Sequence, residues 1–151
     1  MRRSGFTLIE MLIVITLIGV VGAMAFPKWH TAYDHENVRA ARREALTQLN
    51  RAKGTAVQRG CRATIQMRAT GTKVWVEACR MTALAGSTTD TVGFISLLST
   101  KYGVTMTTSA DSLPFAPTSL GLGTATITMT FTKNGYTSTL TVTSIGRATW
   151  Q

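Results

Sequence analysis

The chain of 151 residues is poor in the side chains that most often carry out chemistry. It has two histidines, two cysteines and seven acidic residues. No Ser/His/Asp arrangement, nucleotide-binding loop, repeat or low-complexity tract is present. The acidic residues after the first 30 positions are scattered and lack metal-ligand spacing: they are Asp34, Glu36, Glu44, Glu77, Asp90 and Asp111. The composition argues against an enzyme, and we expect neither a cofactor nor a metal site.

Charged residues make up only 15% of the chain, yet the net charge is +9. This balance fits three partners: nucleic acid, an anionic membrane surface, or other subunits in a charge-matched assembly. Charge alone does not choose between them. The length allows one small domain once the apolar N-terminal segment is set aside.

The two cysteines, Cys61 and Cys79, flank a hairpin-like pattern. An even count in a chain with an export segment suggests a disulfide formed outside the cytoplasm. The alternative is a pair of buried free thiols. Zinc is disfavoured because no histidine or further cysteine lies nearby.

A long apolar run extends from Phe6 to Phe26 and carries a single charge, Glu10. A helix of this length spans about 30 Å, the thickness of a bilayer core. An acid costs about 2.5–3.5 kcal/mol at the centre of a membrane helix and less near its end. Glu10 is therefore expected to have a partner or a task.

Three interpretations compete for residues 1–26. The first is a secretory signal peptide cut near Ala23-Met24-Ala25, and the second is an ordinary single-pass anchor. The third is a leader that is cut after Gly5 while the apolar segment is retained. Glu10 argues against the first two, because neither needs a carboxylate. Basic residues flank both ends of the run, so they do not settle its topology.

The run Gly5-Phe6-Thr7-Leu8-Ile9-Glu10, with the apolar segment after it, resembles the class III signal of type IV pilins and type II secretion pseudopilins. The resemblance implies that a prepilin peptidase cuts between Gly5 and Phe6 and methylates the Phe6 amine. It also implies that Glu10 meets the Phe6 amine of a neighbouring subunit during assembly. Phe6 and Glu10 are four residues apart, hence on one helical face, where an amine and a carboxylate can neutralise one another.

Small residues within the apolar run either permit close packing against other helices or reflect ordinary membrane-helix composition: they are Gly19, Gly22, Ala23 and Ala25. Pro27 is expected to kink the helix, and it matches the proline found there in many pilins. From residue 31 to residue 59 the pattern becomes amphipathic. Its narrow apolar stripe suits a helix laid against a sheet; the stripe comprises Val38, Ala41, Ala45, Leu49, Ala52 and Ala56.

The flanks of this stripe are basic. Arg39, Arg43 and Arg51 are expected to point to solvent, while Arg42 and Lys53 border the stripe. A solvated face is the ordinary explanation, and a nucleic-acid groove is the alternative. Gly60 is expected to end the helix.

The remainder is rich in strand signals. Strands 61–68 and 73–80 flank a turn at 69–72, and if Cys61 faces Cys79, Ile65 lies opposite Trp75. We expect residues 82–91 to form a loop and residues 111–123, with Pro114 and Pro117, to form a connection. Residues 92–98 and 102–108 are weaker strand candidates.

Residues 124–144 give the clearest hairpin signal. Asn134-Gly135 favours a two-residue turn, which pairs Met129 with Leu140 and places threonines opposite threonines on the other face. One apolar and one hydroxyl face fit a sheet that packs on a helix and is open to water. Residues 145–151 are expected to form a short strand or tail.

A narrower resemblance involves the helix end at 51–60, the cysteine-bounded hairpin and the closing Ser144-Ile145-Gly146-Arg147. These resemble the GspH/FimT group of minor pilins and pseudopilins. Some FimT-like members bind DNA through a C-terminal Gly-Arg-x-Arg. Here Thr149 replaces the second arginine, so Arg147 is either a DNA contact or a surface strand residue.

Taken together, the sequence predicts an α+β, type IV pilin-like protein whose long N-terminal helix packs on an antiparallel sheet. Residues 1–5 are the leader, 6–26 the transmembrane and filament-core helix, and 27–151 the periplasmic or extracellular domain, with helix 31–59 and sheet 61–151. The expected function is a structural subunit, a minor pilin or H-type pseudopilin. The alternatives are a DNA-uptake pilin and a major pilin.

The expected location is the inner membrane, with one span, followed by the fibre. The expected partners are other pilin or pseudopilin subunits, a prepilin peptidase and the inner membrane. Nucleic acid is a further partner only under the DNA-uptake alternative.

Overall fold

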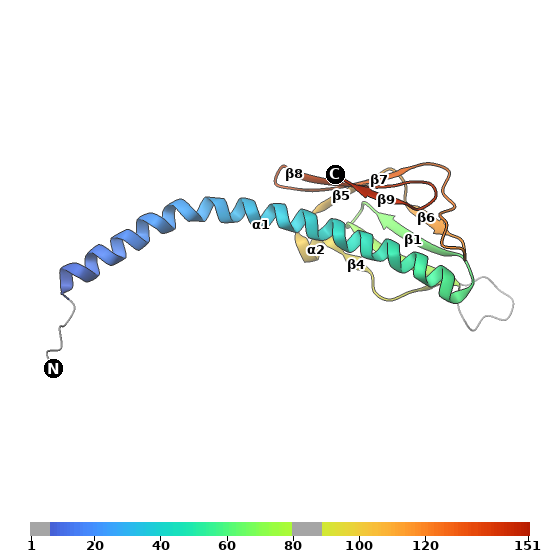
Figure 1. The fold of residues 1–151 in the computed structure, drawn as a ribbon, viewed down its shortest axis with the longest axis horizontal. Coiled ribbons are helices and arrows are strands. Elements are labelled where there is room, and N and C mark those ends of the chain that lie inside the picture. The colour runs from blue at the N-terminus through green and yellow to red at the C-terminus, as the bar shows by residue number, and fades with distance from the viewer. Residues whose placement is uncertain (1–6, 80–88) are drawn as a thin grey trace, which may run out of the picture. The chain divides into compact units, whose positions relative to one another are not determined.

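The computed structural model describes residues 7–79 and 89–151, and between residues 25 and 28 it describes the backbone alone. The expected loop at 82–91 lies mostly outside these ranges. The chain divides into two compact units, Met1–Asp34 and His35–Gln151, each of which is described by itself. The helix α1, Leu8–Arg59, contributes to both (Figure 1).

The ends of α1 follow from local chemistry. At its start the backbone N–H of Glu10 donates to Thr7 Oγ1 at 3.3 Å, which caps the first turn. At its end Gly60 adopts a left-handed conformation with φ 60° and stops the helix as expected. The backbone is helical through residues 25–28. The side chain of Pro27 lies outside the description, so its kink stays a prediction.

In the first unit, the described part of α1 is apolar from Leu8 to Met24. Large side chains from Leu8 to Met24 are exposed, with Leu8 84% and Met24 71% accessible. Within the described residues no single helix is long and apolar enough to cross a membrane on its own. The segments Leu8–Met24 and Trp29–Arg59 satisfy the length and hydropathy criterion together.

In the second unit the helix packs on two antiparallel sheets. The first has the order β3-β2-β1-β6, with β4 also paired to β2, and the second has the order β5-β7-β8-β9. A short helix, α2, Leu98–Tyr102, precedes β5. The strands are β1 Ala63–Arg68, β2 Lys73–Cys79, β3 Thr89–Thr91, β4 Ser96–Leu97, β5 Thr105–Thr108, β6 Ser112–Phe115, β7 Ile127–Lys133, β8 Tyr136–Val142 and β9 Ala148–Trp150.

The apolar stripe of α1 forms one side of the core, as predicted. All six of its residues are buried, and they join one cluster with side chains of both sheets, such as Ile65, Val76 and Leu140. Burial of Val38 or Leu49 contributes about 1.5–3 kcal/mol each and burial of each alanine contributes less, and the small alanines let the helix lie close to the sheets. The predicted α+β class, with a long helix on antiparallel sheet, is confirmed.

The β7–β8 hairpin has the predicted register. Met129 pairs with Leu140 and Lys133 with Tyr136. Asn134 and Gly135 both have positive φ, 47° and 85°, as a type I′ turn requires. The expected final strand is β9.

The β1–β2 hairpin forms, but its predicted register is wrong by one residue. Ile65 lies opposite Val76 rather than Trp75. A one-residue slip exchanges the faces of a strand. The observed register buries Val74, Val76 and Ala78 and leaves Glu77 on the outer face, where it accepts hydrogen bonds from Trp75 at 2.8 Å and Gln66 at 3.0 Å.

The expectation of a connection at 111–123 is also wrong, because Ser112–Phe115 forms β6 against β1. Pro114 is tolerated because β6 is an edge strand, where a missing backbone N–H costs no ladder hydrogen bond. The loop expected at 82–91 ends earlier, since Thr89–Thr91 forms β3. The strands predicted at 92–98 and 102–108 are shorter in the structure, where they correspond to β4 and β5. Leu98 and Tyr102, which the prediction assigned to these strands, lie in α2.

Candidate assembly site

The N-terminal motif lies at the entry to α1. Gly5 and Phe6, the expected cleavage and methylation positions, are outside the described residues. Glu10 is in the first turn of the helix, where a carboxylate also interacts favourably with the helix dipole. The motif's threonine therefore has a structural task, because Thr7 caps the helix on which Glu10 sits.

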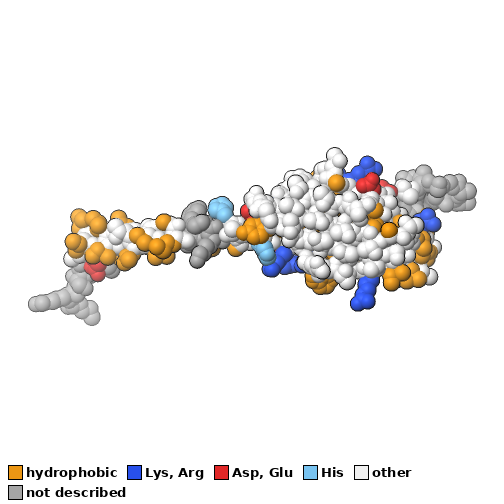
Figure 2. Space-filling view, turned by 90° about the horizontal axis from the view of Figure 1, so that it is seen from above, with side chains coloured by type: hydrophobic (Ala, Val, Ile, Leu, Met, Phe, Trp, Pro, Cys, Tyr) orange, Lys and Arg blue, Asp and Glu red, His pale blue; other side chains and the backbone are white. Residues whose placement is uncertain are grey.

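The helix surface that follows Glu10 exposes mainly large apolar side chains as far as Met24, with Thr16 as a polar exception. Figure 2 shows hydrophobic side chains covering the slender helix of the first unit. Each large side chain left in water forgoes about 1.5–3 kcal/mol of burial. Around Gly19 and Gly22 the space for a β-carbon is empty, with nothing within 4 Å. The helix thus offers an apolar face with flat positions at which another helix backbone can approach closely.

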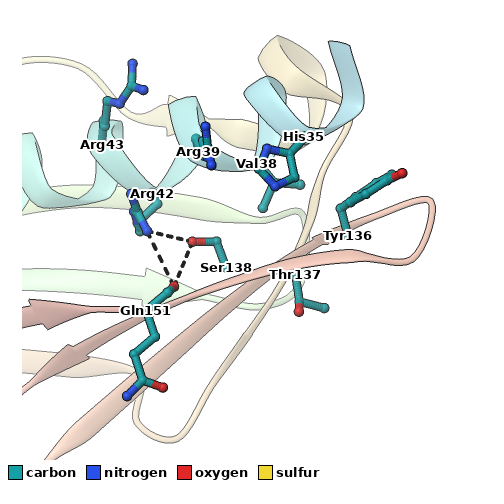
Figure 3. Close-up of a pocket in the computed structure, with 9 residues that line it drawn as sticks. All are labelled: His35, Val38, Arg39, Arg42, Arg43, Tyr136, Thr137, Ser138 and Gln151. Carbon is teal, nitrogen blue, oxygen red and sulfur yellow. Dashed lines mark hydrogen bonds between the residues drawn. The ribbon is translucent and has the colours of Figure 1, made fainter. Parts of the chain in front are cut away.

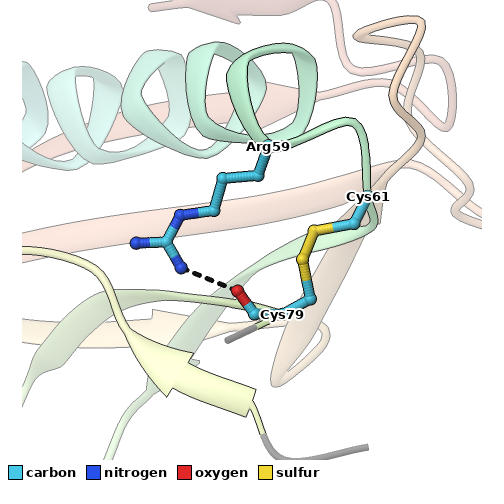
Figure 4. Close-up of a disulfide and its surroundings, with 3 residues drawn as sticks. All are labelled: Arg59, Cys61 and Cys79. Atoms are coloured by element: carbon cyan, nitrogen blue, oxygen red, sulfur yellow. Dashed lines mark hydrogen bonds between the residues drawn. A yellow bond between two sulfur atoms is a disulfide. The ribbon is translucent and has the colours of Figure 1, made fainter. Parts of the chain in front are cut away.

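A disulfide joins the C-terminal end of α1 to the first sheet. Cys61 and Cys79 are bonded, with their Cα atoms 6.3 Å apart. Arg59 in the last turn of α1 donates to the main-chain oxygen of Cys79 at 2.8 Å (Figure 4). The predicted pairing is present, and a charge-assisted hydrogen bond accompanies it.

Arg147 lies on the exposed turn between β8 and β9. Its backbone N–H donates to Thr143 Oγ1 at 3.0 Å, and its carbonyl accepts from the Thr143 N–H at 2.9 Å. The preceding Gly146 has φ 87° and is buried against Phe115. Position 146 therefore needs glycine for backbone and space, and Arg147 projects from a fixed turn.

A cavity of about 360 Å³ lies between α1 and β8. Figure 3 shows its lining, with Arg42 bonded to Ser138 and Gln151. Arg39 and Arg43 are exposed and Arg42 is half-buried, as their places around the stripe predict. The cavity itself is not predicted by the sequence. The spacing of the arginines predicts that they share one side of the helix, but the local sequence does not predict that β8 packs opposite them.

Arg51 differs from its expected solvent position. It is half-buried, with its guanidinium 4.9 Å from the Phe94 ring centroid and a hydrogen bond to Gln48 Oε1 at 3.4 Å. Within residues 7–79 and 89–151, no group of three or more His, Cys, Asp or Glu side chains is placed to hold a metal ion.

The first comparison, with models of protein families, concerns the N-terminus of the chain. Residues 1–26 match the model of the prokaryotic N-terminal methylation motif. No curated protein matches the chain. The match is confined to the N-terminal 26 residues and includes the apolar segment.

The second comparison, with solved structures, concerns the fold. A crystal structure of the Pseudomonas aeruginosa (strain PAO1) type IV minor pilin FimU in space group P21 aligns with a TM-score of 0.58 at 15% identity, covering 77% of this chain and 89% of that one. The same pilin in space group P65 aligns with a TM-score of 0.51 at 17% identity, covering 75% and 91%. The chain thus has the type IV pilin-like fold together with the methylation motif, and the GspH/FimT group is compatible with both.

Proposed function

We propose that this chain is a structural subunit of a type IV pilus or type II secretion pseudopilus, a minor pilin or H-type pseudopilin. The observation that carries the proposal is the exposed apolar helix with one acid in its first turn, both of which lie within the matched N-terminal methylation motif. Such a surface requires either lipid or other helices around it.

In the proposed mechanism, a prepilin peptidase removes residues 1–5 and methylates the amine of Phe6. The helix then holds the subunit in the inner membrane as a single span, with the domain outside the cytoplasm. On assembly it leaves the lipid and packs among the helices of neighbouring subunits. Glu10 meets the Phe6 amine there, and their opposite charges offset the cost of burying either one.

The mature N-terminus and the Glu10→Ala variant test this proposal. Mass spectrometry is expected to find a chain that starts at methylated Phe6; a start at Phe26 would contradict the proposal. Glu10→Ala is expected to leave cleavage intact and to lower the amount of the subunit in sheared fibres. Ile9→Ala is the neighbouring control, and equal incorporation of Glu10→Ala and wild type would remove the role of Glu10.

DNA uptake is the second candidate, favoured by the exposed Arg147 on its fixed turn. DNA retention is then expected to weaken steeply with salt and to fall for Arg147→Ala. Retention no stronger than that of a neutral pilin domain would exclude it. The major-pilin alternative is decided by the ratio of this subunit to others in sheared fibres.

A further inference from the structure

The cavity between α1 and β8 is a basic pocket, defined here by His35, Arg39 and Arg42 from the helix and by Tyr136, Ser138 and Gln151 from the strand side. The helix residues recur at spacings of four and three, so they share one face of α1. The rings of Tyr136 and His35 pack nearly perpendicular to one another, with centroids 5.5 Å apart. The helix and β8 together thus enclose a polar hollow (Figure 3).

The guanidinium of Arg42 is held in place at this pocket. Its Nη1 donates to Ser138 Oγ at 2.9 Å and to the main-chain oxygen of Gln151 at 3.4 Å. Ser138 Oγ in turn donates to the same oxygen at 3.2 Å, and the Trp150 ring lies 5.9 Å from the guanidinium carbon. A cation fixed in this way loses little side-chain entropy when it binds an anion.

Arg39 supplies a second, uncommitted cation. Among the described residues it makes no hydrogen bond or ion pair, and no Asp or Glu lines the pocket. Arg43 at the rim is instead paired with Glu36 at 3.0 Å. Arg39 therefore brings positive charge to a pocket that no described Asp or Glu side chain lines, which favours an anionic ligand.

The whole domain has the same imbalance. Residues 35–151 contain thirteen Lys and Arg against five Asp and Glu, a net charge of +8. Three of the five acids already have partners within the chain: Glu36 with Arg43, Glu44 with Lys101, and Glu77 with Trp75. A second copy would bring the same positive charge and few carboxylates. The complementary partner is therefore a different and more acidic chain.

We propose that the basic pocket receives an Asp or Glu carboxylate from a neighbouring, acidic pilin-like subunit of the same fibre. This inference rests on the proposed function. The pocket volume equals that of on the order of ten water molecules, enough for the end of one side chain. Duplex DNA draws its affinity from several phosphates along its backbone, whereas a concave pocket accepts one anionic group, which the guanidinium of Arg39 can bind in a bidentate manner.

Charge reversal of Arg39 is the main test, because within the described residues this side chain makes no hydrogen bond or ion pair that the change would break. The full-length chain is expressed in its own host with Arg39→Glu, Arg39→Lys or, as a control with the same change of charge, Arg68→Glu at the exposed end of β1. Incorporation is the amount of the subunit in sheared fibres relative to that in membranes. We expect Arg39→Glu to lower it by about tenfold and Arg68→Glu to change it by less than about twofold. Arg39→Lys keeps the charge but loses the bidentate geometry, so its incorporation is expected to lie between those of Arg39→Glu and wild type.

Arg42→Glu is a second variant, expected to act in the same direction. Arg42 also donates a hydrogen bond to Ser138, so the thermal unfolding of the Arg42→Glu variant is compared with that of wild type. If Arg42→Glu does not fold, the incorporation of Arg39→Glu alone tests the proposed contact. Wild-type incorporation of Arg39→Glu would overturn the pocket and leave the subunit role standing. Wild-type protein missing from fibres would instead refute the proposed function.

Retention on DNA tests whether the pocket binds DNA phosphates instead of a carboxylate from a neighbouring subunit. Wild type, Arg39→Glu and Arg68→Glu are compared on immobilised duplex DNA at increasing salt. Equal retention by the two variants, with lost incorporation for Arg39→Glu alone, supports the subunit contact. Retention lost only in Arg39→Glu, with normal incorporation, would overturn it in favour of a phosphate contact.

Discussion

Gln48 Nε2 donates a hydrogen bond of 2.8 Å to Ser96 Oγ, which joins a fully buried side chain of α1 to the start of β4. Ser96 Oγ then donates to Glu44 Oε1 at 3.0 Å, and Lys101 Nζ lies 3.3 Å from the other carboxylate oxygen of Glu44. The segment 96–101 is therefore fastened to the helix by a continuous polar chain rather than by apolar contacts alone. Buried polar groups of this kind are costly when a partner is lost.

Ser96→Ala tests this chain of hydrogen bonds. Loss of the hydroxyl leaves buried Gln48 without its acceptor and is expected to lower the free energy of unfolding by about 1–3 kcal/mol. Asn50→Ala, at an exposed position of the same helix, is expected to change it by less than about 0.5 kcal/mol. Thermal unfolding of the mature chain in detergent micelles, followed by circular dichroism, measures both. Equal melting of the two variants would contradict the structural role of Ser96.

The disulfide between Cys61 and Cys79 closes a loop with a sequence separation of 18 residues. The double variant Cys61→Ser/Cys79→Ser is expected to lose about 2–4 kcal/mol of stability, since the unfolded chain is no longer constrained. Reduction of the wild-type protein gives the matching control and is expected to produce the same loss. An unchanged melting temperature in both cases would show that the bond is dispensable for the fold.

Gly146 and Gly54 form a matched pair for glycine replacement. A β-carbon at Gly146 would lie 2.6 Å from Phe115 Cε1 on a backbone with φ 87°, so Gly146→Ala is expected to destabilise by about 1–3 kcal/mol. At Gly54, inside α1, nothing lies within 4 Å. Gly54→Ala is expected to stabilise by up to about 1 kcal/mol through helix propensity. Opposite shifts in melting temperature are the expected result, and shifts of the same sign would contradict it.

Gly22 tests helix packing in the apolar segment. Gly22→Leu keeps the segment hydrophobic, so cleavage and membrane insertion are expected to be unchanged, while the larger side chain prevents close helix approach. The expected result is a loss of about tenfold or more in sheared fibres, whereas Val21→Leu is close to wild type. Normal incorporation of Gly22→Leu would show that small residues here are ordinary membrane-helix composition.

The parts of the fold that the sequence predicts are those set by local, repeated signals. The six-residue stripe of α1 and the Asn134-Gly135 hairpin are correct to the residue, because each depends on one period or one turn. The predicted β1–β2 register is wrong because it assumes that Cys61 and Cys79 lie directly opposite one another in the ladder. The burial of Val74 and Val76 decides the pairing instead. β6 is not predicted because a proline such as Pro114 ordinarily interrupts a strand. It is tolerated at a sheet edge, and the sequence does not show that this strand lies at one.

The candidate site divides in the same way. The N-terminal motif is contiguous, so sequence alone is enough to find Glu10 and the apolar surface behind it. The basic pocket requires Ser138 and Gln151 to meet Arg42 across about a hundred positions of chain. Nothing in the local sequence specifies that meeting; it follows from how the β7–β8 hairpin docks on α1.

The covalent link between Cys61 and Cys79 also has a mechanical consequence. A pull along α1 toward its N-terminus would act in shear on the contact between the helix stripe and the sheets, which apolar packing resists only weakly once sliding begins. The disulfide anchors the end of α1 to β2, just beyond Arg59. The end of α1 is thus joined to β1 by the main chain at residues 60–62 and to β2 by the disulfide, so the load passes into both strands of the β1–β2 ladder.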